Sequence, residues 1–176
     1  MKLVLLLSSV IFATTTTAAE KFTKGPLITG YGINTKVEQT NPVSKNQVFK
    51  VAFDIAKHGP DDKVNNKINS LARFLNMHVR AGIPAKNIQL ALVVHGEAGF
   101  DIMHNKAYQE KFLTDNPNLE LLQKLMANGV RVIQCGQSAA FHGIKNADMM
   151  EGAEMALSAM TAHALLQQQG YTLNPF

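Results

Sequence analysis

The sequence predicts an α/β protein in which helices cover both faces of a mostly parallel sheet of four to five strands. Residues 47–55 alternate apolar and polar side chains, which is typical of a strand. Residues 88–94 form an apolar run with one Gln, as in a strand buried on both faces, and residues 130–134 predict a third, short strand. Helical segments separate these strands, and strand–helix–strand repeats form right-handed parallel units. A three-layer α/β sandwich follows.

The remaining segments predict helices and two short strands. Apolar residues recur at helical spacing over 64–79, and the polar turn at 58–62 is expected to cap that helix at its start. Asn116 is expected to cap another helix, which stops at Gly129. The other expected elements are a helix over 105–113, a strand over 154–157, a helix over 159–169 and a short strand over 171–174.

The chain divides into three segments. Residues 1–19 have the layout of a cleavable signal peptide, with Lys2, an apolar run over 3–12 and small residues up to Ala19. That run is shorter than the ~20 residues that span a bilayer, so we expect a periplasmic or secreted protein without membrane insertion after signal removal. Residues 20–46 predict an extended arm, and residues 47–176 form the α/β domain.

Composition and motifs exclude several classes of function. The net charge is +4 among 176 residues, and no basic run or aromatic-basic stripe indicates a nucleic-acid partner. The histidines form no i,i+4 pair and no HExxH motif, and GxSxG, P-loop and GxGxxG motifs are absent. We therefore expect no cofactor and no metal.

Methionines cluster in the C-terminal part of the chain. Thioether ligands suit Cu(I), so copper binding is a lesser possibility, but Met side chains more often fill cores or interfaces. Packing is the favoured interpretation for Met149, Met150, Met155 and Met160.

The candidate site lies where the predicted strands end. Ligands of open parallel sheets bind beyond the carboxyl ends of the strands. His95 and Glu97 follow the second strand and Cys135 follows the third, so the three residues are expected at one edge. The single cysteine cannot form an intramolecular disulfide, and it is either a buried inert residue or a reactive thiol.

A reactive Cys135 needs groups that favour its thiolate. A helix that begins after Cys135 would direct backbone N–H groups at the sulfur. His95 and His142 are the candidate bases, and Glu97 is a candidate to orient one of them. The candidate substrate-binding residues are Gly96, Glu97, Gly136, Gln137 and Ser138.

Several short blocks resemble the DsrE/DsrF-like family, in particular its exported branch. They are residues 130–144 around Cys135, residues 154–160, residues 166–171 and the strand end at 93–96. The resemblance covers roughly residues 47–176, and the arm more loosely. It implies a flavodoxin-like sandwich that assembles into homotrimers or homohexamers.

The resemblance also implies a function. In the sulfur-relay members a cysteine at the position of Cys135 carries sulfane sulfur as a persulfide. We therefore expect a sulfur carrier or sulfurtransferase, with sulfur donor and acceptor proteins or small sulfur compounds as partners. Those members are cytoplasmic, so an exported relay would need a different donor and acceptor. The alternative is a non-catalytic binding or assembly module that kept the fold and lost the chemistry.

Overall fold

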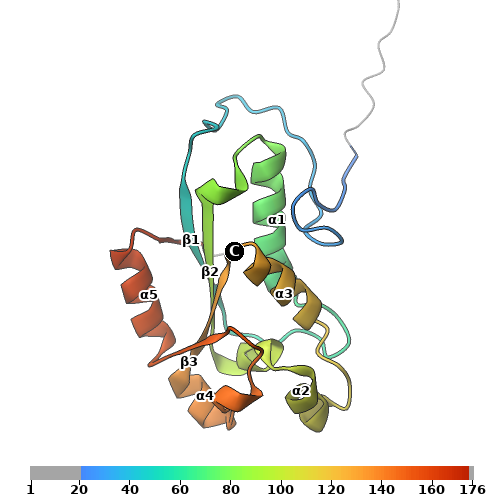
Figure 1. The fold of residues 1–176 in the computed structure, drawn as a ribbon, viewed down its shortest axis with the longest axis vertical. Coiled ribbons are helices and arrows are strands. Elements are labelled where there is room, and N and C mark those ends of the chain that lie inside the picture. The colour runs from blue at the N-terminus through green and yellow to red at the C-terminus, as the bar shows by residue number, and fades with distance from the viewer. Residues whose placement is uncertain (1–20, 175–176) are drawn as a thin grey trace, which may run out of the picture.

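A five-stranded parallel sheet forms the centre of the protein (Figure 1). The computed structural model describes residues 21–174, and the expected signal segment lies outside them. The strand order is β4-β3-β2-β1-β5, with every neighbouring pair parallel, so the predicted sheet is confirmed. The strands are β1 (Phe49–Ile55), β2 (Ile88–Val94), β3 (Arg131–Cys135), β4 (Glu154–Ala156) and β5 (Thr172–Asn174).

Helices cover both faces of this sheet. In Figure 1, α5 lies on one side of the strands, and α1 and α3 lie on the other. Within residues 21–174, no helix has both the length and the apolar character needed to cross a membrane. The helices are α1 (Asn66–Arg80), α2 (Asn105–Phe112), α3 (Leu119–Ala127), α4 (Gly136–His142) and α5 (Ala159–Gln168), with short 3-10 helices η1 (Ala85–Asn87), η2 (Gly96–Ile102) and η3 (Asn146–Asp148).

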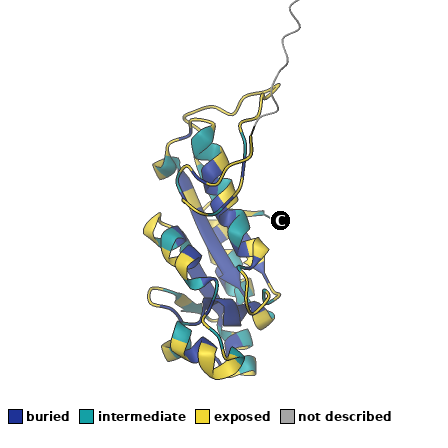
Figure 2. Cartoon of the chain, turned by 90° about the vertical axis from the view of Figure 1, so that its right-hand side faces the viewer, coloured by how far each residue is buried: buried dark blue, intermediate teal, exposed yellow. Residues whose placement is uncertain are grey.

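The sheet separates two hydrophobic cores. The larger core is centred on Phe53, Leu90 and Leu92, which face α1 and α3. Figure 2 shows the buried strands in the middle, with exposed residues on the outer surfaces of the helices. Because side chains alternate between the faces of a strand, neighbouring positions pack against α5. That smaller core consists of Ala52, Ala91, Val93, Ile133, Ala162 and Leu166.

The register brings the three central strands to a common end. Ile55 of β1 pairs with Val94 of β2, and Val94 lies opposite Gln134 of β3. The next residues, His95 and Cys135, therefore lie at one edge of the sheet. This is the lower edge in Figure 1, where α4 and η2 close the end of the strands.

Two helix starts differ from the expectation. The turn at 58–62 does not cap α1, because Asn65 is the N-cap and its side chain accepts from the N–H of Lys67 at 2.9 Å. Helix α3 begins at Leu119, with Asn118 rather than Asn116 at the cap position. The physical reason is a buried aspartate, Asp101, which organises these polar residues as described below.

The arm before β1 packs against α1. Ile28 is buried, and the side-chain oxygen of Asn76 accepts from the N–H groups of Leu27 and Ile28 at 2.9 and 2.7 Å. Gly32 lies so close to Ala72 that a Cβ would come within 2.4 Å of its carbonyl carbon. Asn76 thus supplies the polar partners of an arm that has little regular structure of its own.

The clustered methionines differ in burial. Met149 and Met150 are buried in the larger core, and Met155 packs against it. These three side chains have the packing role that the sequence favoured. Met160, at the start of α5, is 80% exposed.

Candidate functional site

Cys135 is the last residue of β3 and the N-cap residue of α4. A short helix therefore starts directly after the cysteine, as expected from the sequence. Its side chain lies on the α5 face, because Ile133, two residues earlier in the strand, packs in the core beneath α5. The residue is only 5% exposed. The thiol is thus buried at the edge of the sheet, between the starts of α4 and α5.

Hydrogen-bond donors surround the sulfur. Burial by itself raises the pKa of the Cys135 thiol. The Ser138 hydroxyl and the backbone N–H groups of Ser138, Ala159 and Gln137 outweigh it, and the pKa lies below its ordinary value. Gln137 and Ser138 belong to the first turn of α4, and Ala159 is the first residue of α5. The N-termini of two helices therefore stabilise one thiolate.

The Ser138 hydroxyl is oriented by a second contact. Its Oγ accepts from the backbone N–H of Gly96 at 2.9 Å. Because that N–H occupies a lone pair of the oxygen, the hydroxyl proton is free to point at the sulfur of Cys135. Ser138 consequently links the end of β2 to the thiol.

Two glycines permit this close packing. A Cβ on Gly136 would lie 2.5 Å from the carbonyl oxygen of Ala156, at the end of β4. Gly96 has a φ of +53°, and a Cβ there would lie 2.8 Å from the carbonyl oxygen of Ala56. Both positions therefore require glycine for the two strand ends to approach as they do.

A carboxylate holds two histidines on the face of the sheet that carries Cys135. Nε2 of His95 lies 3.0 Å from Oδ2 of Asp54, and Nε2 of His163 lies 2.7 Å from Oδ1. Asp54 belongs to β1, His95 follows β2 and His163 is on α5, so all three lie on the face that carries Cys135. Burial raises the pKa of Asp54, but the contacts from His163 and His95 lower it by more, so it remains below its usual value. We call these three residues the histidine–aspartate cluster.

The structure brings only some of the predicted residues to the thiol. Gly136, Gln137, Ser138 and Gly96 adjoin it, as described above. Glu97 is exposed in η2, and the carboxylate that contacts His95 is that of Asp54 rather than that of Glu97.

His142 lies elsewhere. It is the last residue of α4, about 10 Å along the helix from its start. Its ring packs against Phe100 and Phe141, at centroid distances of 5.3 and 5.0 Å. The structure thus does not place His142 beside the sulfur of Cys135.

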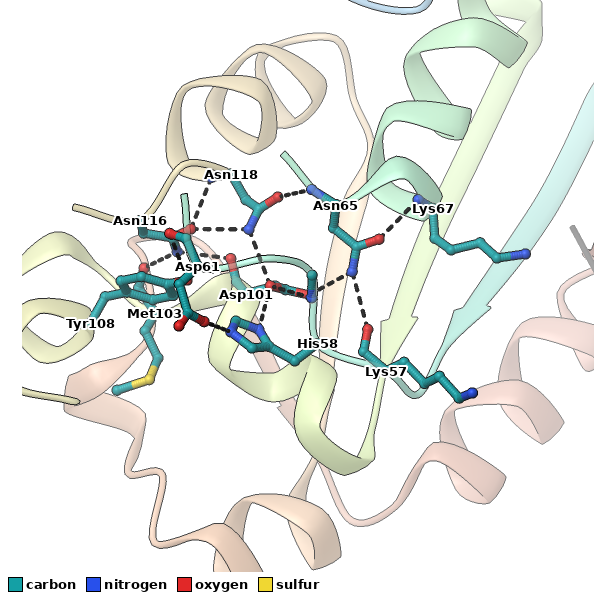
Figure 3. A network of polar contacts seen from close by, with 11 residues as sticks. Lys57, His58, Asp61, Asn65, Lys67, Asp101, Met103, Tyr108, Asn116 and Asn118 are labelled. Carbon is teal, nitrogen blue, oxygen red and sulfur yellow. Dashed lines mark hydrogen bonds and ion pairs between the residues drawn. The ribbon is translucent and has the colours of Figure 1, made fainter. Parts of the chain in front are cut away.

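A second polar cluster lies at the same edge of the sheet but on the opposite face (Figure 3). Its centre is Asp101 of η2, whose side chain is fully buried. The carboxylate accepts from the side chains of Asn65 at 2.7 Å and Asn118 at 3.1 Å, and from the backbone N–H of Gly59 at 3.2 Å. His58 Nδ1 lies 2.7 Å from it. Asp101 therefore joins the end of β1 to the starts of α1 and α3.

This network changes the pKa of its titratable members. The close contact with Asp101 raises the pKa of His58, against the lowering effect of burial, and Asp61 adds a smaller contribution. Burial, with Asp101 and Asp61 nearby, raises the pKa of Tyr108 to about 12. The network therefore favours the protonated form of His58, which would give the buried carboxylate a counter-charge.

No set of three or more His, Cys, Asp or Glu side chains within residues 21–174 is arranged to hold a metal ion. The histidine–aspartate cluster is instead paired internally, nitrogen to oxygen. Carboxylate–histidine contacts of this kind are suited to holding or transferring a proton.

Sequence reasoning missed Asp54, His163 and the donor at Ala159. Asp54 left a signal, since it is the polar residue at the end of a strand that is otherwise apolar at that end. His163 and Ala159 left none, because they reach the site only through the packing of α5 on the sheet.

The comparisons with known proteins agree with the fold. The model of the DsrE/DsrF-like family matches residues 50–175, which is most of the chain. The chain belongs to the DsrE/DsrF-like family. No curated protein matches it.

Two solved structures are similar to this DsrE/DsrF-like protein. The ychN protein from E. coli has 18% sequence identity and a TM-score of 0.50, covering 73% of this chain and 100% of its own. The protein of unknown function MTH1491 from Methanobacterium thermoautotrophicum has 16% identity and a TM-score of 0.49, covering 73% of this chain and 99% of its own. At these identities the ychN likeness shows the fold alone.

Proposed function

We propose that this protein is a sulfur carrier or sulfurtransferase that acts through Cys135. The observation that carries the proposal is the environment of the sulfur, where the donors of two helix starts and one hydroxyl favour the thiolate. A thiolate is the form of cysteine that attacks sulfane sulfur. Membership of the DsrE/DsrF-like family supports the same chemistry.

The loading step is a balanced exchange. The thiolate attacks the outer sulfur of a persulfide donor, so that Cys135–S⁻ and R–S–SH give Cys135–S–SH and R–S⁻. One S–S bond breaks and one forms, and no external oxidant is required.

The polar surroundings of the sulfur distinguish this proposal from the alternative of a binding module. A cysteine that merely fills space lies among apolar groups. Cys135 is 5% exposed yet has polar donors, which favours the carrier over the module. The neighbours Gln137 and Leu157 are exposed, so we expect a donor to approach from this edge, and the burial of the sulfur favours a small sulfur compound over a bulky one.

The proposal extends to location and assembly. The signal-like layout of residues 1–19 supports a mature carrier in the periplasm or outside the cell. Self-association into a trimer or hexamer is supported by Phe141, Leu157 and Met160, large apolar side chains that are 86%, 71% and 80% exposed.

Intact-mass spectrometry after incubation with polysulfide tests the proposal. The wild-type protein is expected to gain about the mass of one sulfur atom, which dithiothreitol removes. Cys135→Ser is expected to keep the fold by circular dichroism and to gain nothing. A folded wild-type protein that forms no adduct would contradict the proposal.

A further inference from the structure

The histidine–aspartate cluster is not needed to stabilise the thiolate. The groups that lower the pKa of Cys135 come from Ser138, Ala159 and Gln137, and none of them belongs to the cluster. Asp54 is nevertheless held on both oxygens, by His95 at 3.0 Å and His163 at 2.7 Å. Two imidazoles on one partly exposed carboxylate require an explanation beyond packing.

Strand geometry places His95 next to Cys135. Val94 lies opposite Gln134, so the residues that follow them end neighbouring strands, which lie about 4.8 Å apart. Both side chains lie on the α5 face. Gly96, which follows His95, also donates to the hydroxyl of Ser138, which in turn bonds to the sulfur. His95 is thus a histidine that follows β2 beside the end of β3, on the face that carries Cys135.

The contact with Asp54 fixes which nitrogen of His95 is available. Nε2 faces the carboxylate, so Nδ1 is the nitrogen left for a ligand. In a protonated ring, Nε2–H donates to Asp54 while Nδ1–H remains free to donate. His163 occupies the other carboxylate oxygen and prevents the carboxylate from rotating away.

We propose that Asp54 is a positioning residue, which holds His95 as the acid that protonates the sulfur leaving the donor when Cys135 is loaded. This inference rests on the proposed function. The thiolate of Cys135 attacks one sulfur of the donor, the S–S bond breaks, and the departing R–S⁻ takes the proton of His95 to leave as R–SH. His95 is then neutral and regains its proton from solvent.

The substrate class follows from this chemistry. A leaving alkyl thiolate is strongly basic, and an acid accelerates its departure, whereas a weakly basic leaving group needs none. The cluster therefore fits sulfur donors that release an alkyl thiol, such as low-molecular-weight hydropersulfides; a simple disulfide has the same leaving group but gives a mixed disulfide, so it serves only as a probe of this step.

Asp54→Asn tests the inference with two small reagents. Bis(2-hydroxyethyl) disulfide releases an alkyl thiolate, and S-methyl methanethiosulfonate releases a sulfinate that needs no proton. The variant should react with the disulfide about tenfold more slowly than wild type. This loss is smaller than the ~10²-fold contribution of a complete general acid, because His95 remains in the variant. With the methanethiosulfonate the change should stay below about twofold.

Asp61→Asn is the matched control, because Asp61 also contacts a histidine, Nε2 of His58 at 3.0 Å, but on the opposite face. It should change neither rate. Asp54→Asn added to His95→Gln should cause no further loss, because Asp54 acts through His95.

The outcomes separate the two proposals. Equal slowing of Asp54→Asn with both reagents would assign a structural role to Asp54 and overturn this inference. Unchanged rates with both reagents would also overturn it, and the carrier function would stand. A wild-type protein that reacts with neither reagent and forms no persulfide would contradict the proposed function itself.

Discussion

The substitution Asp101→Asn probes the buried network that joins the end of β1 to α1 and α3. Each carboxylate oxygen of Asp101 already accepts a hydrogen bond, Oδ2 from Asn65 at 2.7 Å and Oδ1 from Asn118 at 3.1 Å. An asparagine must place its NH₂ group at one of these positions, where it meets another donor. At least one buried donor then loses its partner.

The magnitude follows from burial. An orphaned buried donor costs about 1–3 kcal/mol, and removing one partner of a buried ion pair costs about 3–5 kcal/mol. The Asp101 side chain is 0% exposed and that of its partner His58 is 13% exposed, so solvent screens the pair little. We expect Asp101→Asn to lower the free energy of unfolding by about 3–5 kcal/mol near neutral pH.

Urea denaturation followed by circular dichroism measures this loss. Asp61→Asn is the control, because Asp61 contacts the same histidine but its side chain is 58% exposed. An exposed pair contributes at most about 1 kcal/mol, so this variant should remain close to wild type. A loss below about 1 kcal/mol for Asp101→Asn would refute the assignment of a stabilising role to the network.

The contact between His58 and Asp101 also predicts that the free energy of unfolding depends on pH. The pKa of His58 is raised in the folded protein, mainly by Asp101. Its contribution is therefore fully present below the unfolded pKa of ~6.5 and is lost as the pH rises through the higher folded value. Unfolding measured from pH 6 upwards should show this loss in wild type but not in Asp101→Asn. Equal slopes in the two proteins would contradict the raised pKa.

Two further predictions concern the thiol. Ser138→Ala removes a hydroxyl that donates to the sulfur, so the pKa of Cys135 should rise. The pH profile of alkylation by iodoacetamide measures this pKa. An unchanged profile would contradict the hydrogen bond assigned to Ser138. Gly136→Ala places a Cβ 2.5 Å from the carbonyl oxygen of Ala156. We expect this substitution to lower the free energy of unfolding in urea by about 1–3 kcal/mol, whereas Gln137→Ala, at an exposed position, should lower it little. Equal stabilities of the two variants would show that the end of β4 shifts to make room for the added Cβ.

The layered fold could be predicted because its elements carry local signals. The apolar run of β2 was predicted with the same bounds that the structure shows, since a strand buried on both faces needs apolar residues throughout. The predicted cap of α1 is wrong. The turn at 58–62 has typical capping residues, but Asn65 caps the helix in the structure. Asp101, which lies 36 residues from Asn65 in sequence, decides that geometry, and no local pattern reveals such a contact.

The candidate site was predictable where strand ends define it. Cys135 and His95 follow neighbouring strands, so the rule for parallel sheets placed them together. The partner of His95 was not predictable, because Asp54 is 41 residues away and Glu97 is only two. His142 is a candidate base in the sequence, but helix α4 carries it away from the cysteine.

Discharge of a loaded protein tests the carrier most directly. The protein is first loaded with ³⁴S-labelled polysulfide, separated from the reagent, and mixed with a small acceptor thiol. We predict that the intact mass returns to that of the unmodified protein while the label appears in the acceptor as R–S–³⁴SH, and that Cys135→Ser neither loads nor transfers. A label that stays on the protein, or that loads equally on Cys135→Ser, would contradict the account of Cys135 as the residue that carries sulfur.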